Sequence, residues 1–292
     1  MGLQVHLVDG TYELFRYFYA LPSHVNGAGE EVSAVRGVVG SIVGMLHDGA
    51  THVGVATDHV IDSWRNDLSA TYKDGSGVDP TLFAQFPILE EALGAAGFTV
   101  WPMVEDEADD ALGAAASVAA ADDRVEQALI CTPDKDLGQC VGGKVVQLDR
   151  RKGVVMDADG VQDKFGVRPE SIPDYLALVG DSADGFPGLE GWGAKSAAAV
   201  LLRYGHLEDI PDAPGQWDVG VRSATRLART LAAHRDEAYL FRTLATLRTE
   251  CEVGVVDDWR WTGPTAALPA MAERLDQPDL VRRIDAIARR RA

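Results

Sequence analysis

Cysteine is scarce in this chain of 292 residues: Cys131, Cys140 and Cys251 are its three, and no two have a CxxC spacing. That number argues against a disulfide scaffold and a cysteine-based zinc site, and favours a reducing, cytoplasmic setting. No apolar run reaches the roughly 18 residues of a membrane span, and the polar N-terminal segment does not resemble a signal peptide. We therefore expect an ordinary soluble globule, with 46% hydrophobic and 25% charged residues.

Positive charge is also scarce, since 27 Lys and Arg stand against 45 Asp and Glu, for a net charge of −18. Taken alone, this balance argues against nucleic acid, which is bound by basic patches. Many of the acids, however, lie in short clusters rather than in a tail, and hard cations require such clusters. The overall charge leaves the class of partner open.

Short apolar stretches alternate with helical patterns in the first half of the chain. We predict strands at residues 4–9, 51–57, 98–102, 127–131 and 144–149. This alternation indicates an α/β fold with a mostly parallel sheet flanked by helices. After about residue 161 the pattern is helical to the end, which predicts an α/β region at 1–165 and a helical region at 166–292.

Acidic residues follow four of the predicted strands by a few positions. They are Asp9, Asp58, the run at 105–110 that contains Glu107, Asp109 and Asp110, and the pair Asp134 and Asp136. In an open parallel sheet, ligands gather at the carboxyl ends of strands, so these side chains should converge on one edge. Asp181 and Asp184 add two more acids in a glycine-rich loop.

Each acid also has a simpler interpretation. Asp9 and Asp58 could be helix N-caps or turn residues, the acids at 107–110 could complement a helix dipole, and the others could be cap or loop residues. If the acids do converge within about 10 Å, however, their repulsion favours protonation or cation binding. Oxygen ligands without Cys or His indicate Mg²⁺ or Mn²⁺ rather than zinc. Two such cations about 4 Å apart can activate water and bind a scissile phosphate.

The motifs that contain these acids resemble those of a known family, the bacterial 5′-nucleases or flap endonucleases, which include the N-terminal nuclease domain of DNA polymerase I. The similarity covers roughly residues 7–249. Its motifs are LVDGTYELFR (7–16), a strand ending at Asp58, WRNDLSATYK (64–73), EADD (107–110), TPDKDLGQ (132–139) and LVGDSADGFPGLEGWGAKSA (178–197).

The resemblance implies a PIN-like fold of the flap-endonuclease type, with a helical arch at about 60–80 and a helix–three-turn–helix element at about 171–204. It assigns the region 1–165 to nuclease chemistry and 166–292 to DNA binding. It also implies two divalent cations. Asp9, Asp58, Glu107 and Asp109 would mainly hold one, Asp134, Asp136, Asp181 and Asp184 the other, and Asp110 would lie between them.

Basic residues and glycines receive roles from the same resemblance. Arg65 and Lys73 match arch residues that reach the scissile phosphate, although a solvated surface position is the alternative. Arg16 and Lys135 match DNA-binding positions, and either could instead be a local salt-bridge partner. The DNA-binding residues of the helix–three-turn–helix would be Gly191, Gly193, Lys195 and Ser196, beside a K⁺ site. A P-loop is excluded because Ala194 separates Gly193 from Lys195 and the loop follows a helix.

The sequence departs from the family pattern at a few positions. Asp74 to Gly77 replace a basic residue and prolines after Lys73, Pro133 replaces glycine, and Gly185 replaces asparagine. These changes concern the arch and DNA affinity more than the chemistry.

The expected function is a free-standing, monomeric nuclease in the cytoplasm, associated with the nucleoid. Its partner would be DNA with 5′ ends, flaps or nicks, including RNA-primed DNA, in primer removal and repair. Two alternatives are a PIN-type ribonuclease and a DNA-junction protein that no longer cleaves. The first usually lacks the arch and the helix–three-turn–helix, and the second would be favoured by a lost carboxylate, but none is missing.

Overall fold

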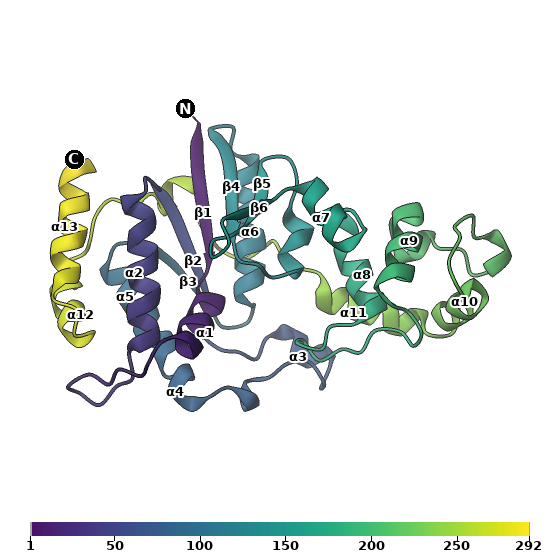
Figure 1. Cartoon of the computed structure of the whole chain (residues 1–292), viewed down its shortest axis with the longest axis horizontal. Coiled ribbons are helices and arrows are strands. Elements are labelled where there is room, and N and C mark those ends of the chain that lie inside the picture. The colour runs from purple at the N-terminus through teal and green to yellow at the C-terminus, as the bar shows by residue number, and fades with distance from the viewer. Residues whose placement is uncertain (1, 292) are drawn as a thin grey trace. The chain divides into compact units, whose positions relative to one another are not determined.

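The computed structural model describes residues 2–291, and its helices and strands are labelled in Figure 1. Contacts divide the chain into two compact units. The first unit holds the described residues up to Ile61, Gly75–Thr132 and the chain from Thr249 onward. The second holds Asp62–Asp74 and Pro133–Arg248. No helix in residues 2–291 is both long enough and apolar enough to span a membrane.

The first unit contains a parallel sheet, as the alternation of apolar strands and helices predicts. Its strands pair in the order β3-β2-β1-β4, and each described pairing among them is parallel. Their bounds are β1 Leu3–Asp9, β2 His52–Asp58, β3 Thr99–Met103 and β4 Val125–Cys131. Residues 52–57 of β2 are all buried, which is typical of a strand covered on both faces.

Helices cover this sheet. The alanine-rich α6 packs against all four strands, and α1 and α5 contact β2. Near the end of the chain, α12 packs on α5 and α13 packs on α2. The bounds are α1 Gly10–Ala20, α2 Ser33–His47, α4 Pro80–Phe83, α5 Gln85–Ala95, α6 Ala108–Ala121, η6 Val256–Trp259, α12 Leu268–Arg274 and α13 Asp279–Arg291.

The second unit is mainly helical. Its strands β5 (Val145–Asp149) and β6 (Val154–Met156) form an antiparallel pair, and β6 is absent from the predicted strands. Leu178, Phe186 and Trp192 belong to its buried core. The helices are α3 Trp64–Leu68, η2 Asp136–Cys140, α7 Ala158–Phe165, η3 Pro169–Ser171, α8 Ile172–Val179, α9 Ala194–Tyr204, η4 Leu207–Asp209, η5 Pro214–Gln216, α10 Ala224–Ala233 and α11 Arg235–Ala245.

These units group the chain differently from a simple division after residue 165. Residues 133–165 pack with the helices that follow them, and the chain from Thr249 returns to the first unit. Side-chain anchors explain the return: the Trp261 indole donates to the Ala96 carbonyl at 2.9 Å, and the Trp259 and Trp101 rings meet edge to face at 5.5 Å. The arch predicted at 60–80 contains α3, η1 (Gly75–Gly77) and the start of α4.

Candidate active site

The first unit carries carboxylates at the ends of neighbouring strands. Asp9 is the last residue of β1 and Asp58 the last of β2. The registers pair Asp9 with Ala56 of β2 and Asp58 with Met103 of β3. Since the strands are parallel, their carboxyl ends lie along one edge of the sheet, as the sequence predicts.

Backbone N–H groups at two helix starts fix these side chains. Oδ1 of Asp9 accepts a hydrogen bond from Tyr12 N at 2.7 Å, so Asp9 is the N-cap of α1. Its Oδ2 accepts from the Thr132 hydroxyl at 2.9 Å, and Oδ1 of Asp58 accepts from Ala108 N at 2.7 Å. The capping interpretation is therefore correct for Asp9. It does not exclude cation binding, because a carboxylate has about four lone-pair sites.

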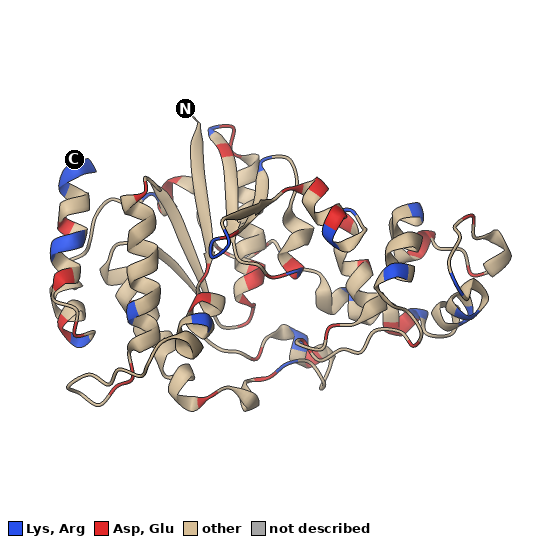
Figure 2. Ribbon diagram, in the orientation of Figure 1, with Lys and Arg blue, Asp and Glu red and all other residues tan. Residues whose placement is uncertain are grey.

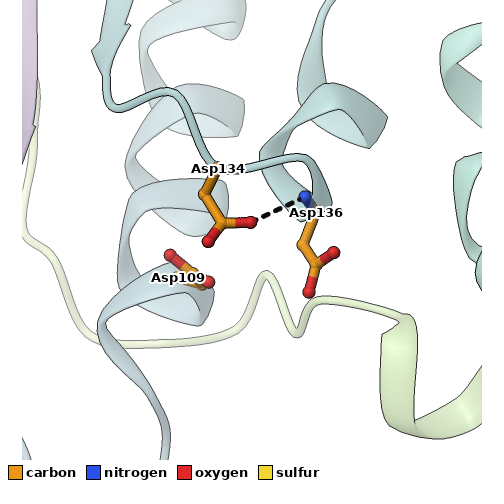
Figure 3. A group of neighbouring side chains, drawn as sticks. All are labelled: Asp109, Asp134 and Asp136. Atoms are coloured by element: carbon orange, nitrogen blue, oxygen red, sulfur yellow. Dashed lines mark hydrogen bonds between the residues drawn. The ribbon is translucent and has the colours of Figure 1, made fainter. Parts of the chain in front are cut away.

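Helix α6 begins with three further acids. Glu107 is its N-cap and is buried, and its backbone N–H donates to Oδ2 of the fully buried Asp110 at 3.0 Å. Asp109, labelled in Figure 3, lies on the first turn and is partly exposed. The positive end of the helix dipole favours negative charge at this position.

A second group of carboxylates lies within the second unit. Asp136, Asp181 and Asp184 are all buried, and each offers an oxygen within 4.8 Å of the others. Asp136 N donates to Oδ1 of Asp134 at 3.0 Å, which orients the TPDKD loop (Figure 3). We call Asp136, Asp181 and Asp184 the buried carboxylate triad.

Two lysines neutralise part of the triad. Lys73 Nζ lies 3.0 Å from Oδ1 of Asp184, and Lys135 Nζ contacts Asp181 and lies 3.9 Å from Oδ1 of Asp136. Both lysine side chains are about one-third exposed, at 32% and 34%. The salt-bridge alternative for Lys135 is thus observed, although its side chain still reaches solvent.

The triad has the properties of a cation site. Burial, and then the charges of Asp134 and Asp184, raise the pKa of Asp136 well above its ordinary value. Oδ1 of Asp136 is buried and has no hydrogen-bond partner among the described residues. A divalent cation would satisfy this oxygen and relieve the repulsion, and the all-oxygen donor set suits a hard cation.

Arg65 does not occupy the solvated surface position that was the alternative to its predicted phosphate contact. Its side chain is buried at 1% exposure, with Nε donating to Leu244 O at 2.7 Å and Nη2 to Thr246 O at 3.1 Å. These bonds satisfy carbonyls at the end of α11, where a helix lacks internal donors. The observed contacts of Arg65 are therefore structural.

The loop that carries Asp181 and Asp184 packs tightly against the arch segment. Lys73 N donates to Asp184 O at 3.0 Å. Gly185 has a φ of 82°, and a Cβ there would lie 2.0 Å from the Thr71 carbonyl oxygen. Only glycine fits this contact, so the packing of the loop against Thr71 requires the glycine found here.

Arg16 forms a local ion pair with the buried Glu13, and its guanidinium lies 4.1 Å from the centre of the Tyr17 ring. This arrangement matches the alternative of a salt-bridge partner. Its predicted DNA contact stays a prediction.

The predicted helix–three-turn–helix consists of α8, a glycine-rich loop and α9. Gly193 is the N-cap of α9, and the Ser196 hydroxyl accepts from Gly193 N at 3.1 Å and donates to its carbonyl at 2.9 Å. Gly191 has a φ of 81°, which disfavours other residues. Lys195 is exposed on the first turn, as a phosphate contact would require.

Sequence reasoning missed three residues that orient Asp9 and Asp58. The Thr132 hydroxyl binds Asp9, and the Thr11 hydroxyl accepts from Asp58 N at 2.8 Å. Glu90 of α5 accepts from the Thr57 hydroxyl and pairs with His59 Nδ1, both at 2.8 Å, and so holds both neighbours of Asp58. Thr132 is the first residue of the TPDKDLGQ motif, so its role beside the carboxylates could have been predicted. No feature of the sequence connects Glu90 with Asp58.

Comparison with known proteins agrees with this geometry. A family model described as "5'-3' exonuclease, N-terminal resolvase-like domain" matches residues 4–166, and one described as "5'-3' exonuclease, C-terminal SAM fold" matches residues 167–267. The chain is 34% identical to DNA polymerase I of Pseudomonas aeruginosa over 88% of its own length but only 28% of that protein. It is 29% identical to a 5'-3' exonuclease of Aquifex aeolicus over 98% of this chain and 96% of the relative.

Solved structures share the fold at low sequence identity. A T5 5′-exonuclease with bound divalent metal ions (zinc) superposes with a TM-score of 0.68 at 18% identity, covering 98% of this chain and 99% of the other. The catalytic core of Rad2 in complex with DNA substrate gives 0.61 at 18% identity, with 98% and 91% covered. These likenesses confirm the predicted fold class. The matched family model covers more than half of the sequence, and the chain therefore belongs to the 5'-3' exonuclease family.

Proposed function

We propose that this chain is a divalent-metal-dependent, structure-specific 5′-nuclease that acts on DNA as a 5′→3′ exonuclease and a flap endonuclease. The observation that carries the proposal is the buried carboxylate triad, in which Oδ1 of Asp136 accepts no hydrogen bond from the described residues. Membership of the 5'-3' exonuclease family supplies the reaction class.

Each group of acids would hold one cation. The strand-end group consists of Asp9, Asp58, Glu107, Asp109 and Asp110, and the second group is the triad with Asp134. Thr132, which donates to Asp9, precedes Asp134 by two residues in the sequence. When bound, two divalent cations supply an activated water and stabilise the charge on the phosphate and on the leaving oxygen.

Lys73 and Lys135 would then change partners. A cation at the triad would compete with the lysines for Asp184 and Asp181, and it would free both ammonium groups for phosphate oxygens. Their charge would stabilise the negative charge that the transition state develops. The lysines would thus hold the apo site together and contact the substrate in the loaded enzyme.

Several finer points belong to the same proposal. Mg²⁺ or Mn²⁺ would be the catalytic cations, and K⁺ would bind beside the loop of Gly191 and Gly193. The protein would act as a monomer in the cytoplasm, on nucleoid DNA with flaps, nicks or RNA primers. Family membership, the oxygen-only ligands and the relatives named DNA polymerase I support these points.

The test is cleavage of end-labelled DNA of matched sequence, prepared as a 5′-flap, a nicked duplex, a single strand and an RNA-primed duplex. Each substrate is incubated with Mg²⁺, with Mn²⁺ and with EDTA. We expect cutting near the flap junction and stepwise 5′ degradation with either metal, and none in EDTA. Cleavage in EDTA, or no cleavage of any of these substrates with either metal, would overturn the proposal.

A further inference from the structure

One segment of this acidic chain combines an absence of acids with several arginines. Residues 219–235 contain four arginines and no Asp or Glu, although the whole chain has 45 acids. Most of this segment is α10 and its entry loop, and none of it belongs to the motifs that indicate a nuclease. It therefore calls for a separate explanation.

Three arginines of this segment are exposed on α10 or in the turn before it. Leu227, Ala228 and Leu231 of α10 are buried. Arg226 and Arg229 are exposed and three residues apart on one face of the helix, and Arg222 is exposed in the turn that precedes its N-cap Ser223. None of the three has an ion pair among the described residues, whereas Arg203 and Arg235 in the same unit pair with Asp218 and Asp212. We call Arg222, Arg226 and Arg229 the α10 arginine face.

This face borders a hollow of about 1030 Å³ that it shares with the start of α9. Arg222 and Arg226 line one side, and Gly193, Lys195 and Ser196 line the other. No acidic residue lines the hollow. Figure 2 shows the basic segments on α9 and α10 in blue.

Arg226 also touches the glycine-rich loop. A Cβ on Gly191 would lie 3.2 Å from the Arg226 guanidinium carbon, so glycine at this position leaves room for the arginine. The arginine is thereby held beside the loop without an acid to neutralise it. Such an arrangement suits an anion that enters from outside.

We propose that the α10 arginine face is a second phosphate-binding surface, which extends the surface of the helix–three-turn–helix along the backbone of duplex DNA. The inference rests on the proposed function for the identity of the anion. Guanidinium groups bind phosphate with directed hydrogen bonds, and in a chain of net charge −18 DNA contacts must concentrate on local cations. The three arginines are spread over residues 222–229, from the turn into the helix, which fits several phosphates of a strand rather than a single small anion.

The experiment compares duplex binding by the full chain with binding by Arg222→Ala/Arg226→Ala. Fluorescence anisotropy with a labelled 5′-flap duplex is recorded in Ca²⁺ over a series of salt concentrations. If each arginine neutralises one phosphate, the slope of log K against log salt should become shallower by about 1.8, because each contact contributes about 0.9. Arg282→Ala/Arg283→Ala on α13 removes the same charge from another exposed helix and should leave the slope unchanged.

Two further measurements separate the possible outcomes. Arg226→Lys keeps the charge and should retain most of the slope, and thermal melting of every variant checks that the fold survives. If the variants fold and their salt slope is unchanged, this inference is wrong, even though the wild type cleaves DNA as proposed. If the wild type does not cleave any DNA substrate, the proposed function is wrong instead.

Discussion

Lys73 is tied to Asp184 twice: its backbone N–H donates to the Asp184 carbonyl at 3.0 Å, and its Nζ lies 3.0 Å from Oδ1 of the same residue. The backbone bond fixes the position of the arch segment beside the buried carboxylate triad. The side-chain bond is exchangeable, because Nζ is partly exposed and a cation can take its place on Asp184. This pairing connects the arch segment to the site in the absence of metal.

Replacing Lys73 with Ala should therefore affect chemistry more than binding or folding. We expect the single-turnover cleavage rate to fall by roughly 10²-fold or more, since a charge that acts in the transition state is lost. The dissociation constant for duplex DNA and the melting temperature should change little. Lys152→Ala, which removes an exposed lysine paired with Asp149, is the control. Equal rates in the two variants would contradict the role given to Lys73.

Arg65→Ala should have the opposite pattern. The buried guanidinium supplies two hydrogen bonds to the end of α11, and its removal leaves carbonyls unsatisfied and a cavity. We expect the free energy of unfolding to fall by about 3 kcal/mol. Chemical denaturation measures this loss directly. A variant as stable as wild type that cleaves slowly would restore Arg65 to a catalytic role.

The raised pKa of Asp136 predicts that the stability of the metal-free protein depends on pH. Its pKa in the folded protein is raised above the ordinary value of 3.8, so between the two values the folded protein keeps a proton that the unfolded chain releases. The free energy of unfolding should therefore fall as pH rises above about 4 in EDTA. Asp136→Asn should flatten this fall, and saturating Mg²⁺ should do the same in the wild type. Parallel pH profiles for wild type and variant in EDTA would show that Asp136 is not the group responsible.

Glu90→Ala tests the support of Asp58. Loss of the hydrogen bonds to Thr57 and His59 should raise the Mg²⁺ concentration needed for half-maximal cleavage by about 10-fold, the usual effect of removing an outer partner of a metal ligand. Glu90→Gln keeps the hydrogen-bonding groups and should be milder. The neighbouring Glu91→Ala, which loses only an exposed pair with Arg274, serves as the control. An unchanged Mg²⁺ requirement in Glu90→Ala would rule out this support.

Much of the site could be predicted because it depends on local rules. Asp9 and Asp58 end apolar strands, and Glu107 and Asp110 open a helix, so periodicity and turn position alone place them at one sheet edge. The parallel pairing follows from the same alternation, whereas the sheet order was not predicted.

What could not be predicted depends on distant contacts. Arg65 lies in a matching motif, but its burial depends on carbonyls about 180 residues away at Leu244 and Thr246. The return of the chain after Thr249 to the first unit depends on Trp259 and Trp261, whose partners no local pattern specifies. The short strand β6, with two exposed valines, lacks the buried face that marks a strand in sequence.

Cleavage by Asp136→Asn tests the central claim most directly. Asparagine keeps the size of the side chain and removes the charge that would hold a cation at the buried carboxylate triad. With a 5′-flap substrate in Mg²⁺, the account predicts a fall in single-turnover rate of several orders of magnitude with flap binding in Ca²⁺ retained. The exposed Asp163→Asn, an identical change on α7, should cleave like the wild type. Near wild-type cleavage by Asp136→Asn would mean that the triad does not hold the catalytic metal.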